Sequence, residues 1–128
     1  MMFNISINVK REKITYLFKS LEGAYAPNTI RSYRSDYMHY SNWCHKYHYD
    51  PLNIHEDKFA EYILLMGESL TVATIQRRVA SLNSIFNLTK STNPTKEPIV
   101  ILTIKKLRRK FGRLYHPKTS DNFLKFLI

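Results

Sequence analysis

The sequence predicts an all-α protein, a compact bundle of four to five helices. Apolar residues recur at offsets of three and four through most of the chain, which is typical of helices that bury one face. The 128 residues include only three glycines and five prolines, too few for a β-sandwich rich in turns. A hydrophobic content of 44% and an aromatic content of 13% allow a buried core and exclude a wholly disordered chain.

This length favours one domain. We expect a flexible N-terminus over residues 1–8, a helical domain over residues 9–113 and a C-terminal extension over residues 114–128. The single cysteine, Cys44, excludes an intramolecular disulfide and fits a reducing, cytoplasmic setting. The first residues lack the basic and apolar regions of a signal peptide, and no apolar run approaches the roughly 18 residues of a membrane span.

The first helix is expected from about Val9 to Glu22, with an apolar stripe made by Ile14, Leu17, Phe18 and Leu21. Gly23 and Pro27 interrupt the pattern. Asn28 is expected to cap the next helix, because its side chain can accept a hydrogen bond from a free N–H of the first turn.

The helix predicted from Asn28 to Cys44 has two distinct faces. One is a continuous apolar stripe made by Ile30, Tyr33, Tyr37, Tyr40, Cys44 and Tyr47. Another face carries Arg31, Arg34, Ser35 and Met38. The sequence Asp50-Pro51 ends the segment, because a proline disfavours helix in the residue before it.

The next two helices differ in charge. Residues 56–67 bury Phe59, Ile63 and Met66. Four of the ten acidic residues lie in or next to this helix, which should therefore face away from a polyanion: Glu56, Asp57, Glu61 and Glu68. Residues 72–88 form a helix with the stripe Ile75, Val79, Leu82 and Phe86, whereas its polar positions are Gln76, Arg77, Arg78 and Ser81. A loop follows at residues 91–94.

Residues 99–104 allow two interpretations. Their β-branched composition is that of a buried strand. Helical spacing is nevertheless kept by Val100, Ile104, Leu107 and Phe111. A lone strand would leave its backbone groups unpaired, so we expect a helix.

The charge balance points to a polyanionic partner. Twenty Lys and Arg residues against ten Asp and Glu residues give a formal net charge of +10 and a pI near 9.8. A basic but otherwise ordinary protein is the alternative interpretation. The segment from Lys105 to Lys118 holds seven of the twenty basic residues and no acidic one, which suits phosphate contacts that weaken with salt.

Two of the predicted helices carry side chains that suit a DNA groove. Arginine can form two hydrogen bonds with a guanine edge and glutamine with an adenine edge, and both can reach phosphates. The residues of this kind are Arg31, Arg34, Gln76, Arg77 and Arg78. Short donors that fix the register on the DNA backbone are Ser32, Thr74 and Ser81. For each helix alone, the alternative is the polar outer face that any surface helix needs.

No metal, cofactor or small-molecule site is expected from the residues. A fourth metal ligand is not evident beside Cys44, His45 and His48. A solvated helix face, rather than an acidic catalytic cluster, is expected of Glu56, Asp57 and Glu61. Three scattered glycines exclude a glycine-rich phosphate loop.

Several segments, taken in order, resemble the N-terminal core-binding domain of the tyrosine recombinase (phage integrase) family. The second helix of that domain is similar to Pro27-Asn-Thr-Ile-Arg-Ser-Tyr33 with Asn42-Trp-Cys44. Its fourth helix is similar to Leu70-Thr-Val-Ala-Thr-Ile-Gln-Arg-Arg-Val-Ala-Ser-Leu82, and its last to Ile104-Lys-Lys-Leu-Arg-Arg109 with Gly112-Arg113. The turn Asp50-Pro51-Leu52 also matches, so the resemblance covers about residues 10–113.

The resemblance implies a SAM-like bundle that forms one half of a C-shaped clamp on double-stranded DNA. The second and fourth helices would enter the major groove, and the outer helices would contact other recombinase protomers. Carried over residue by residue, the resemblance implies DNA contacts by Thr29, Arg31, Ser32, Arg34, Thr74, Gln76, Arg77, Arg78 and Ser81, and also by Lys105, Lys106 and Arg109. Residues 114–128 lose the resemblance and are expected to be an extension or the start of a linker to a missing catalytic domain.

Two departures from the family concern the ends of helices and their packing. Val72-Ala73 stand where the family often has a Pro-Ser pair at the start of the fourth helix, so the cap of that helix is expected to differ. Lys106 stands where the last helix often has a glycine.

The chemistry of this family is not expected in this chain. It needs two arginines, a lysine, a His-x-x-Arg pair and a tyrosine nucleophile in a following domain, and none of the five histidines here begins such a pair. A nucleophilic tyrosine also needs cations around the phosphorus transition state. Core positions are expected instead for Tyr33, Tyr37 and Tyr40. We therefore expect a protein that binds DNA without cutting it, and no catalytic residue, metal or cofactor.

Alternatives of other classes stay open. The chain could be a standalone helical protein-interaction module, an accessory DNA-binding regulator or a binder of structured RNA. The resemblance is compatible with an excised piece of a recombinase, a natural truncation or a standalone protein. A cytoplasmic location, on the nucleoid when DNA is bound, is expected in each DNA-binding case.

Overall fold

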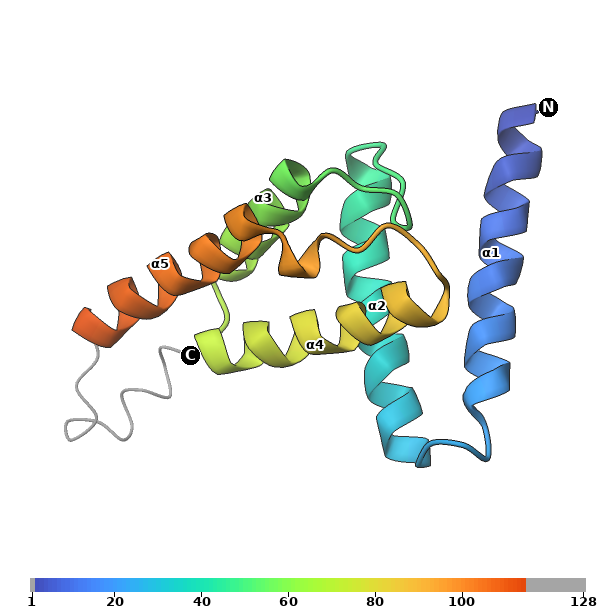
Figure 1. The fold of residues 1–128 in the computed structure, drawn as a ribbon, viewed down its shortest axis with the longest axis horizontal. Coiled ribbons are helices and arrows are strands. Elements are labelled where there is room, and N and C mark those ends of the chain that lie inside the picture. Colours follow the sequence, from blue (N-terminus) through green and yellow to red (C-terminus); the bar gives the residue numbers. More distant parts are fainter. Residues whose placement is uncertain (1, 115–128) are drawn as a thin grey trace. The chain divides into compact units, whose positions relative to one another are not determined.

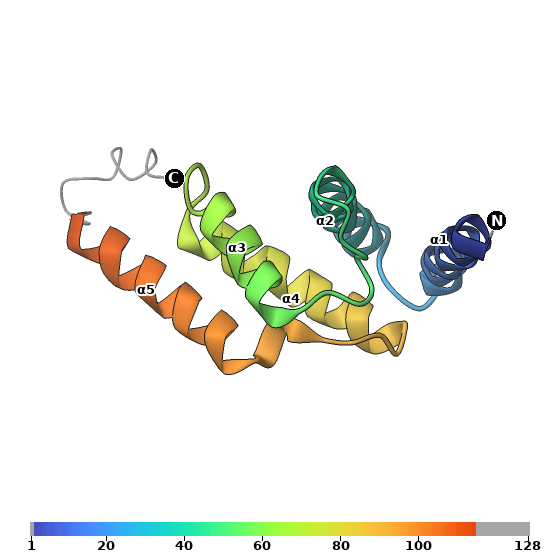
Figure 2. The same ribbon diagram turned by 90° about the horizontal axis from the view of Figure 1, so that it is seen from above.

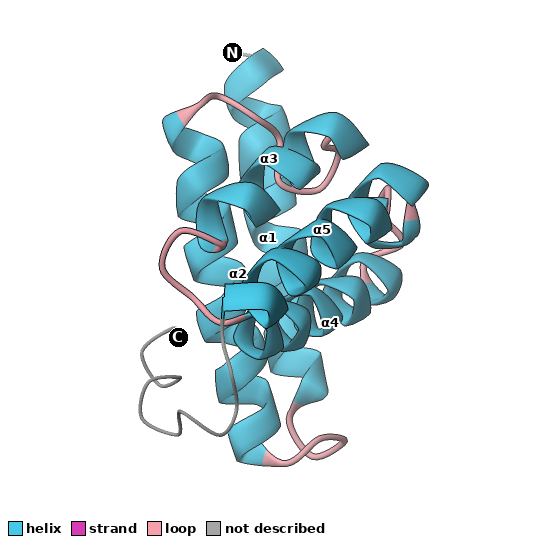
Figure 3. Ribbon diagram, turned by 90° about the vertical axis from the view of Figure 1, so that its left-hand side faces the viewer, coloured by secondary structure: helices cyan, strands magenta, loops and turns pink. Residues whose placement is uncertain are grey.

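The computed structural model describes residues 2–114 of the chain, and the side chains of residues 12–111. These residues form five α-helices and a short 3-10 helix, η1 (Figure 1). The helices are α1 (Met2–Leu21), α2 (Pro27–Lys46), α3 (Glu56–Met66), α4 (Val72–Leu88), η1 (Pro94–Lys96) and α5 (Pro98–Leu114). No β-strand occurs in the described part of the chain (Figure 3), which confirms the predicted all-α class.

The helices gather into two compact units. The first contains α1, α2, the loop as far as Asn53 and the segment Ser81–Asn93. The second begins at Ile54, runs to Ala80 and resumes at Pro94. Helix α4 is continuous, but its first half belongs to the second unit and its second half to the first. The expected single domain over residues 9–113 stays a prediction.

The first residues of α1 and α2 differ from the predicted ones, and the structure decides between the two interpretations of residues 99–104. Helix α1 begins at Met2, earlier than the expected start at about Val9, and the expected flexibility of residues 1–8 stays a prediction. Helix α2 begins at Pro27, which occupies a first-turn position where its missing N–H costs nothing, and the expected cap Asn28 is therefore wrong. Residues 99–104 lie within α5, which confirms the helical interpretation. From residue 115 on, the expected extension lies outside the described residues.

Aromatic side chains form the core of the first unit. Tyr37 of α2 lies between Phe18 of α1 and Tyr40, at centroid distances of 6.4 and 6.2 Å. Tyr40 meets Phe86 of α4 edge-to-face at 5.8 Å, and its hydroxyl donates to the carbonyl of Pro51 at 2.7 Å. The apolar stripe predicted for α2 packs through Tyr37, Tyr40 and Cys44, whereas Tyr47 at its end is 49% exposed and was wrongly expected to pack.

The core of the second unit lies between α3 and α5, which run side by side (Figure 2). Its largest fully buried side chains include Phe59, Tyr62, Ile63, Met66, Ile75 and Val100. The chain turns at Gly67 with φ −65°, an ordinary helical value. A Cβ on this glycine would lie 2.8 Å from Cδ2 of Leu107 and 3.3 Å from the carbonyl oxygen of Leu64. A Cβ at this position would therefore require the end of the Leu107 side chain to shift.

A side-chain cap and a backbone cap define the two ends of α4. Thr71 caps α4, because its Oγ1 accepts a hydrogen bond from the N–H of Thr74 at 3.1 Å. Helix α4 ends with Lys90 in the left-handed region at φ 55°. The N–H groups of Lys90 and Ser91 donate to the carbonyls of Asn87 and Phe86 at 3.1 and 2.9 Å, which is a Schellman motif without its usual glycine.

We expect the Gly67→Ala variant to be less stable by about 1 kcal/mol, because the added methyl group must push aside the end of the Leu107 side chain, which is buried. Urea unfolding followed by circular dichroism measures this loss. The Leu107→Ala background makes room for the methyl, so the cost of Gly67→Ala should shrink there. An equal cost in both backgrounds would contradict the packing role of Gly67.

We expect the Lys90→Gly variant to be more stable by about 0.5–1 kcal/mol, because a left-handed backbone costs an L-residue more than it costs glycine. Thermal unfolding measures the gain. The Lys90→Ala control removes the same charge and keeps the strain, so it should show no gain. A gain of the same size in both variants would assign the effect to charge.

Candidate nucleic-acid interface

Helix α2 presents two arginines on one exposed side. Arg31 and Arg34 are three residues apart, which places their side chains next to each other along the helix. The guanidinium of Arg31 donates to Oδ1 of Asn28, one turn earlier. The guanidinium of Arg34 lies over the ring of Phe18, 5.0 Å from its centroid. Both groups are restrained by neutral partners, so their positive charge stays uncompensated by these contacts.

The short donors predicted on the same helix lie on a different side. Thr29 is two residues from Arg31, a rotation of about 200° around the helix, and Ser32 is two residues from Arg34. Thr29 is half-buried and Ser32 is exposed. A duplex that contacts the arginines edge-on would reach these hydroxyls only by wrapping around α2. The two pairs therefore form two separate surfaces of the helix.

The polar residues predicted on α4 differ in burial. Gln76 and Arg77 are exposed. Arg78 is half-buried, and its guanidinium lies 3.7 Å from the sulfur of Met66. Ser81 is only 5% exposed. Arg78 lies beside the predicted apolar stripe, but Ser81 lies about 40° from Arg77 around the helix, so the stripe does not account for the burial of Ser81.

Thr74 has a structural role at the start of α4. Its backbone N–H is capped by Thr71, and its hydroxyl oxygen accepts a hydrogen bond from the hydroxyl of Thr71 at 2.9 Å. The side chain is half-buried. Its hydroxyl hydrogen can still be donated to a phosphate, because a hydroxyl both accepts and donates.

Helix α5 carries a dense set of exposed cations. The predicted residues Lys105, Lys106 and Arg109 are all exposed. Two further exposed cations were not among the predicted contacts, Arg108 and Lys110. The sequence could have revealed Arg108, because it does not share the side of the helix that buries Thr103 and Leu107. The place of both cations near the C-terminus of the helix also suits the helix dipole.

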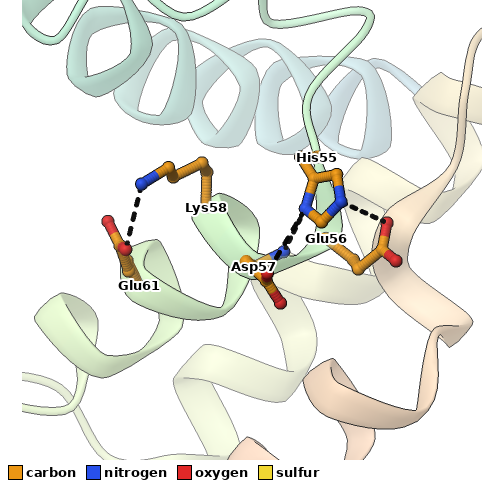
Figure 4. Close-up of polar contacts among 5 residues, drawn as sticks. All are labelled: His55, Glu56, Asp57, Lys58 and Glu61. Carbon is orange, nitrogen blue, oxygen red and sulfur yellow. Dashed lines mark hydrogen bonds and ion pairs between the residues drawn. The ribbon is translucent and has the colours of Figure 1, made fainter.

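The acidic residues of α3 lie on its exposed side and are partly paired (Figure 4). Lys58 Nζ lies 3.5 Å from a carboxylate oxygen of Glu61. His55 caps the helix, because its Nδ1 accepts from the N–H of Asp57 at 3.1 Å, and its Nε2 lies 3.9 Å from a carboxylate oxygen of Glu56. These contacts are solvent-exposed, so each adds little to stability.

The tyrosines of α2 are packing residues, as predicted. Tyr37 and Tyr40 are buried, and the hydroxyl of the half-buried Tyr33 donates to Ser84 Oγ at 3.3 Å. Burial raises the pKa of Tyr37, with a smaller contribution from Cys44, although a hydrogen bond with Ser41 opposes the shift. A tyrosine with a raised pKa is a poorer nucleophile at neutral pH, because its oxyanion is harder to form.

Among the residues that the structure describes, no group of three or more His, Cys, Asp and Glu side chains is arranged to hold a metal ion. No helix within residues 2–114 combines the length and the apolar character needed to cross a bilayer.

Two comparisons with known proteins agree with each other. Residues 15–92 match the family described as phage integrase, N-terminal SAM-like domain. Over 104 residues the chain is 24% identical to an integrase/recombinase xerD homolog from Selenomonas ruminantium. That alignment covers 79% of this chain and 30% of the relative, so the chain spans less than a third of the relative's length.

We expect the Cys44 thiol to be inert towards maleimide in the folded protein and to react after unfolding. Burial raises its pKa from 9.0 to about 12, although a hydrogen bond with Tyr40 opposes the shift. In an unfolded chain the thiol ionises first, so its contribution to stability is complete below pH 9 and is lost between pH 9 and about pH 12. Labelling under native conditions at the unfolded rate would contradict this.

Proposed function

Because the chain belongs to the family of phage integrase N-terminal SAM-like domains, we propose that it binds double-stranded DNA without cleaving it. In this proposal the chain acts as the core-binding part of a tyrosine-type site-specific recombinase. The name of the Selenomonas ruminantium relative, an integrase/recombinase, supports this role. The bound protein would work on the nucleoid in the cytoplasm.

The observation that carries the proposal is the pair of restrained, uncompensated arginines on α2. Asn28 orients Arg31, and the Phe18 ring orients Arg34, without neutralising either charge. Side chains that are already ordered lose less conformational entropy when they bind. A charged fork held in this way suits a phosphate or a guanine edge, both of which arginine bonds through two donors.

The proposed contacts fall into two classes. Bases and phosphates in the major groove would be contacted by Arg31, Arg34, Gln76 and Arg77. Phosphates outside the groove would be contacted by Lys105, Lys106 and Arg109, and by the hydroxyls of Thr29, Ser32 and Thr74. Arg78 and Ser81 would contribute chiefly by orienting α4, because the first is half-buried and the second is buried.

DNA cleavage is proposed to need groups that this chain does not supply. The sequence contains no His-x-x-Arg pair. Burial of Tyr37 and Tyr40 leaves these hydroxyls in the core, where a phosphate cannot reach them. Contacts with other recombinase protomers through the outer helices are part of the proposal, and no cofactor is required for it.

A second candidate, a protein-interaction module, has one observation in its favour. Ile99, Ile101 and Leu102 on the first turns of α5 are 40–53% exposed, and exposed apolar surface can mark a protein contact. Size-exclusion chromatography with light scattering separates the two candidates. A stable oligomer whose mass is unaffected by DNA would favour the module.

We expect the chain to shift a duplex in a gel at low salt, and the Arg31→Glu and Arg77→Glu variants to weaken the shift strongly. The slope of log affinity against log salt should fall by roughly 0.9 for each phosphate contact that is lost. The matched control is Lys96→Glu, an exposed residue of η1 with the same charge change. An equal loss of duplex affinity in the control and in the arginine variants would show that net charge alone explains the effect. That result would contradict the proposed contacts of Arg31 and Arg77 with DNA.

A further inference from the structure

Three aromatic rings cluster where α2 ends. The ring centroid of Trp43 lies 5.7 Å from that of Tyr47 and 5.3 Å from that of Tyr49. Tyr47 and Tyr49 lie 6.2 Å apart with their planes inclined by only 26°. Tyr47 is nevertheless 49% exposed. A cluster that only fixed the loop after α2 would bury its rings, whereas this one leaves aromatic surface open to solvent.

The cluster is separate from the proposed duplex-binding arginines. Trp43 follows Arg34 by nine residues, which is a rotation of about 180° and a rise of about 13.5 Å along the helix. The rings therefore lie on the opposite side of α2 from Arg34 and nearer its other end. A ligand on the rings would not need to displace DNA from Arg31 and Arg34.

The surroundings of the rings are cationic. Lys46 Nζ lies 5.6 Å from the centroid of the Tyr47 ring. His45 and His48 are exposed, and each imidazole offers at least one N–H donor in either charge state. The two carboxylates nearest in sequence are Asp36, which is buried, and Asp50, whose Oδ1 accepts a hydrogen bond from the N–H of Leu52 at 3.0 Å. A ligand that suits this surface has a flat apolar part and an anionic part close to it.

We propose that Trp43, Tyr47 and Tyr49 form a stacking site for an unpaired nucleobase, with Lys46 beside the adjoining phosphate. Aromatic rings accept the face of any base, and cations next to them bind the strand that carries it. Paired bases inside a duplex have no free face, so the ligand is a single strand or an unpaired segment. An uncharged apolar protein surface would take water from the exposed Lys46 ammonium without supplying a counter-charge, which disfavours that alternative.

The chain contains a single tryptophan, so Trp43 fluorescence reports directly on this site. The full chain is titrated with an oligothymidylate of about ten nucleotides, and with an abasic strand that carries the same number of phosphates. The expected result is saturable quenching of Trp43 by the oligothymidylate and little quenching by the abasic strand. Equal quenching by both strands would overturn the proposal, because charge alone would then explain it.

Variants of Tyr47 test the stacking contact. Tyr47→Ala should weaken the affinity for oligothymidylate by about 5- to 100-fold, whereas Tyr47→Phe should keep it, since the ring is retained. The matched control is Tyr16→Ala, which removes a tyrosine of α1 that is 74% exposed. Unchanged affinity of a folded Tyr47→Ala variant would overturn the proposal. So would quenching that rises with protein concentration before any oligonucleotide is added, because it would reveal self-association through the rings.

The stacking site and the proposed duplex face can fail independently. The Arg31→Glu variant should lose the duplex gel shift and keep the base-dependent quenching, whereas Tyr47→Ala should do the reverse. Loss of both activities in either variant, with folding intact by circular dichroism, would show one shared surface and overturn the separate site.

Discussion

The first unit depends on one buried side chain, Tyr40. Its ring packs edge-to-face against both Tyr37 and Phe86, and none of it is exposed. A hydroxyl at that depth would be costly without a partner, and it donates to the carbonyl of Pro51. One residue thus joins α2, the second half of α4 and the loop that leaves α2. A phenylalanine would keep the ring contacts but would lose the hydrogen bond that fixes the path of the loop.

The acidic side chains of α3 and the arginines of α2 differ in the kind of partner they contact. The carboxylates of α3 have cationic neighbours in sequence, as the pairing of Glu61 with Lys58 illustrates. Arg31 and Arg34 are instead restrained by an amide and an aromatic ring. In both cases a neighbouring group restrains the charged side chain. Only the arginines have neutral partners, so only their positive charge remains fully available to attract a polyanion. For a chain with a net charge of +10, this arrangement favours association with a polyanion at low salt.

Periodicity predicted the helices and their buried faces, because the side of a helix that faces the core must be apolar and recurs every three to four residues. Ile75 in α4, which is fully buried, is an example. It did not predict details that depend on contacts between elements. Asn28 has the chemistry of a cap, but Pro27 is preorganised for the first turn, and the helix starts there. Ser81 lies beside the exposed Arg77 around the helix, yet it is buried, so its burial depends on the neighbouring elements and not on the periodicity of α4. The predicted helix ended at Gly67, but its sequence neighbours carry no signal that a larger residue there would meet the side chain of Leu107, forty residues later.

The assignment of α4 to both units has a consequence for how the chain reaches its fold. Each unit is discontinuous: the first is interrupted between Asn53 and Ser81, and the second between Ala80 and Pro94. During synthesis the first unit is complete only when Asn93 has emerged, 47 residues after Lys46 ends α2. Closing that loop costs entropy before the contacts between Tyr40 and Phe86 offset it. Cutting the chain within α4 would separate both units from parts of themselves. Interleaved connectivity of this kind couples the two halves during folding, although each has a core of its own.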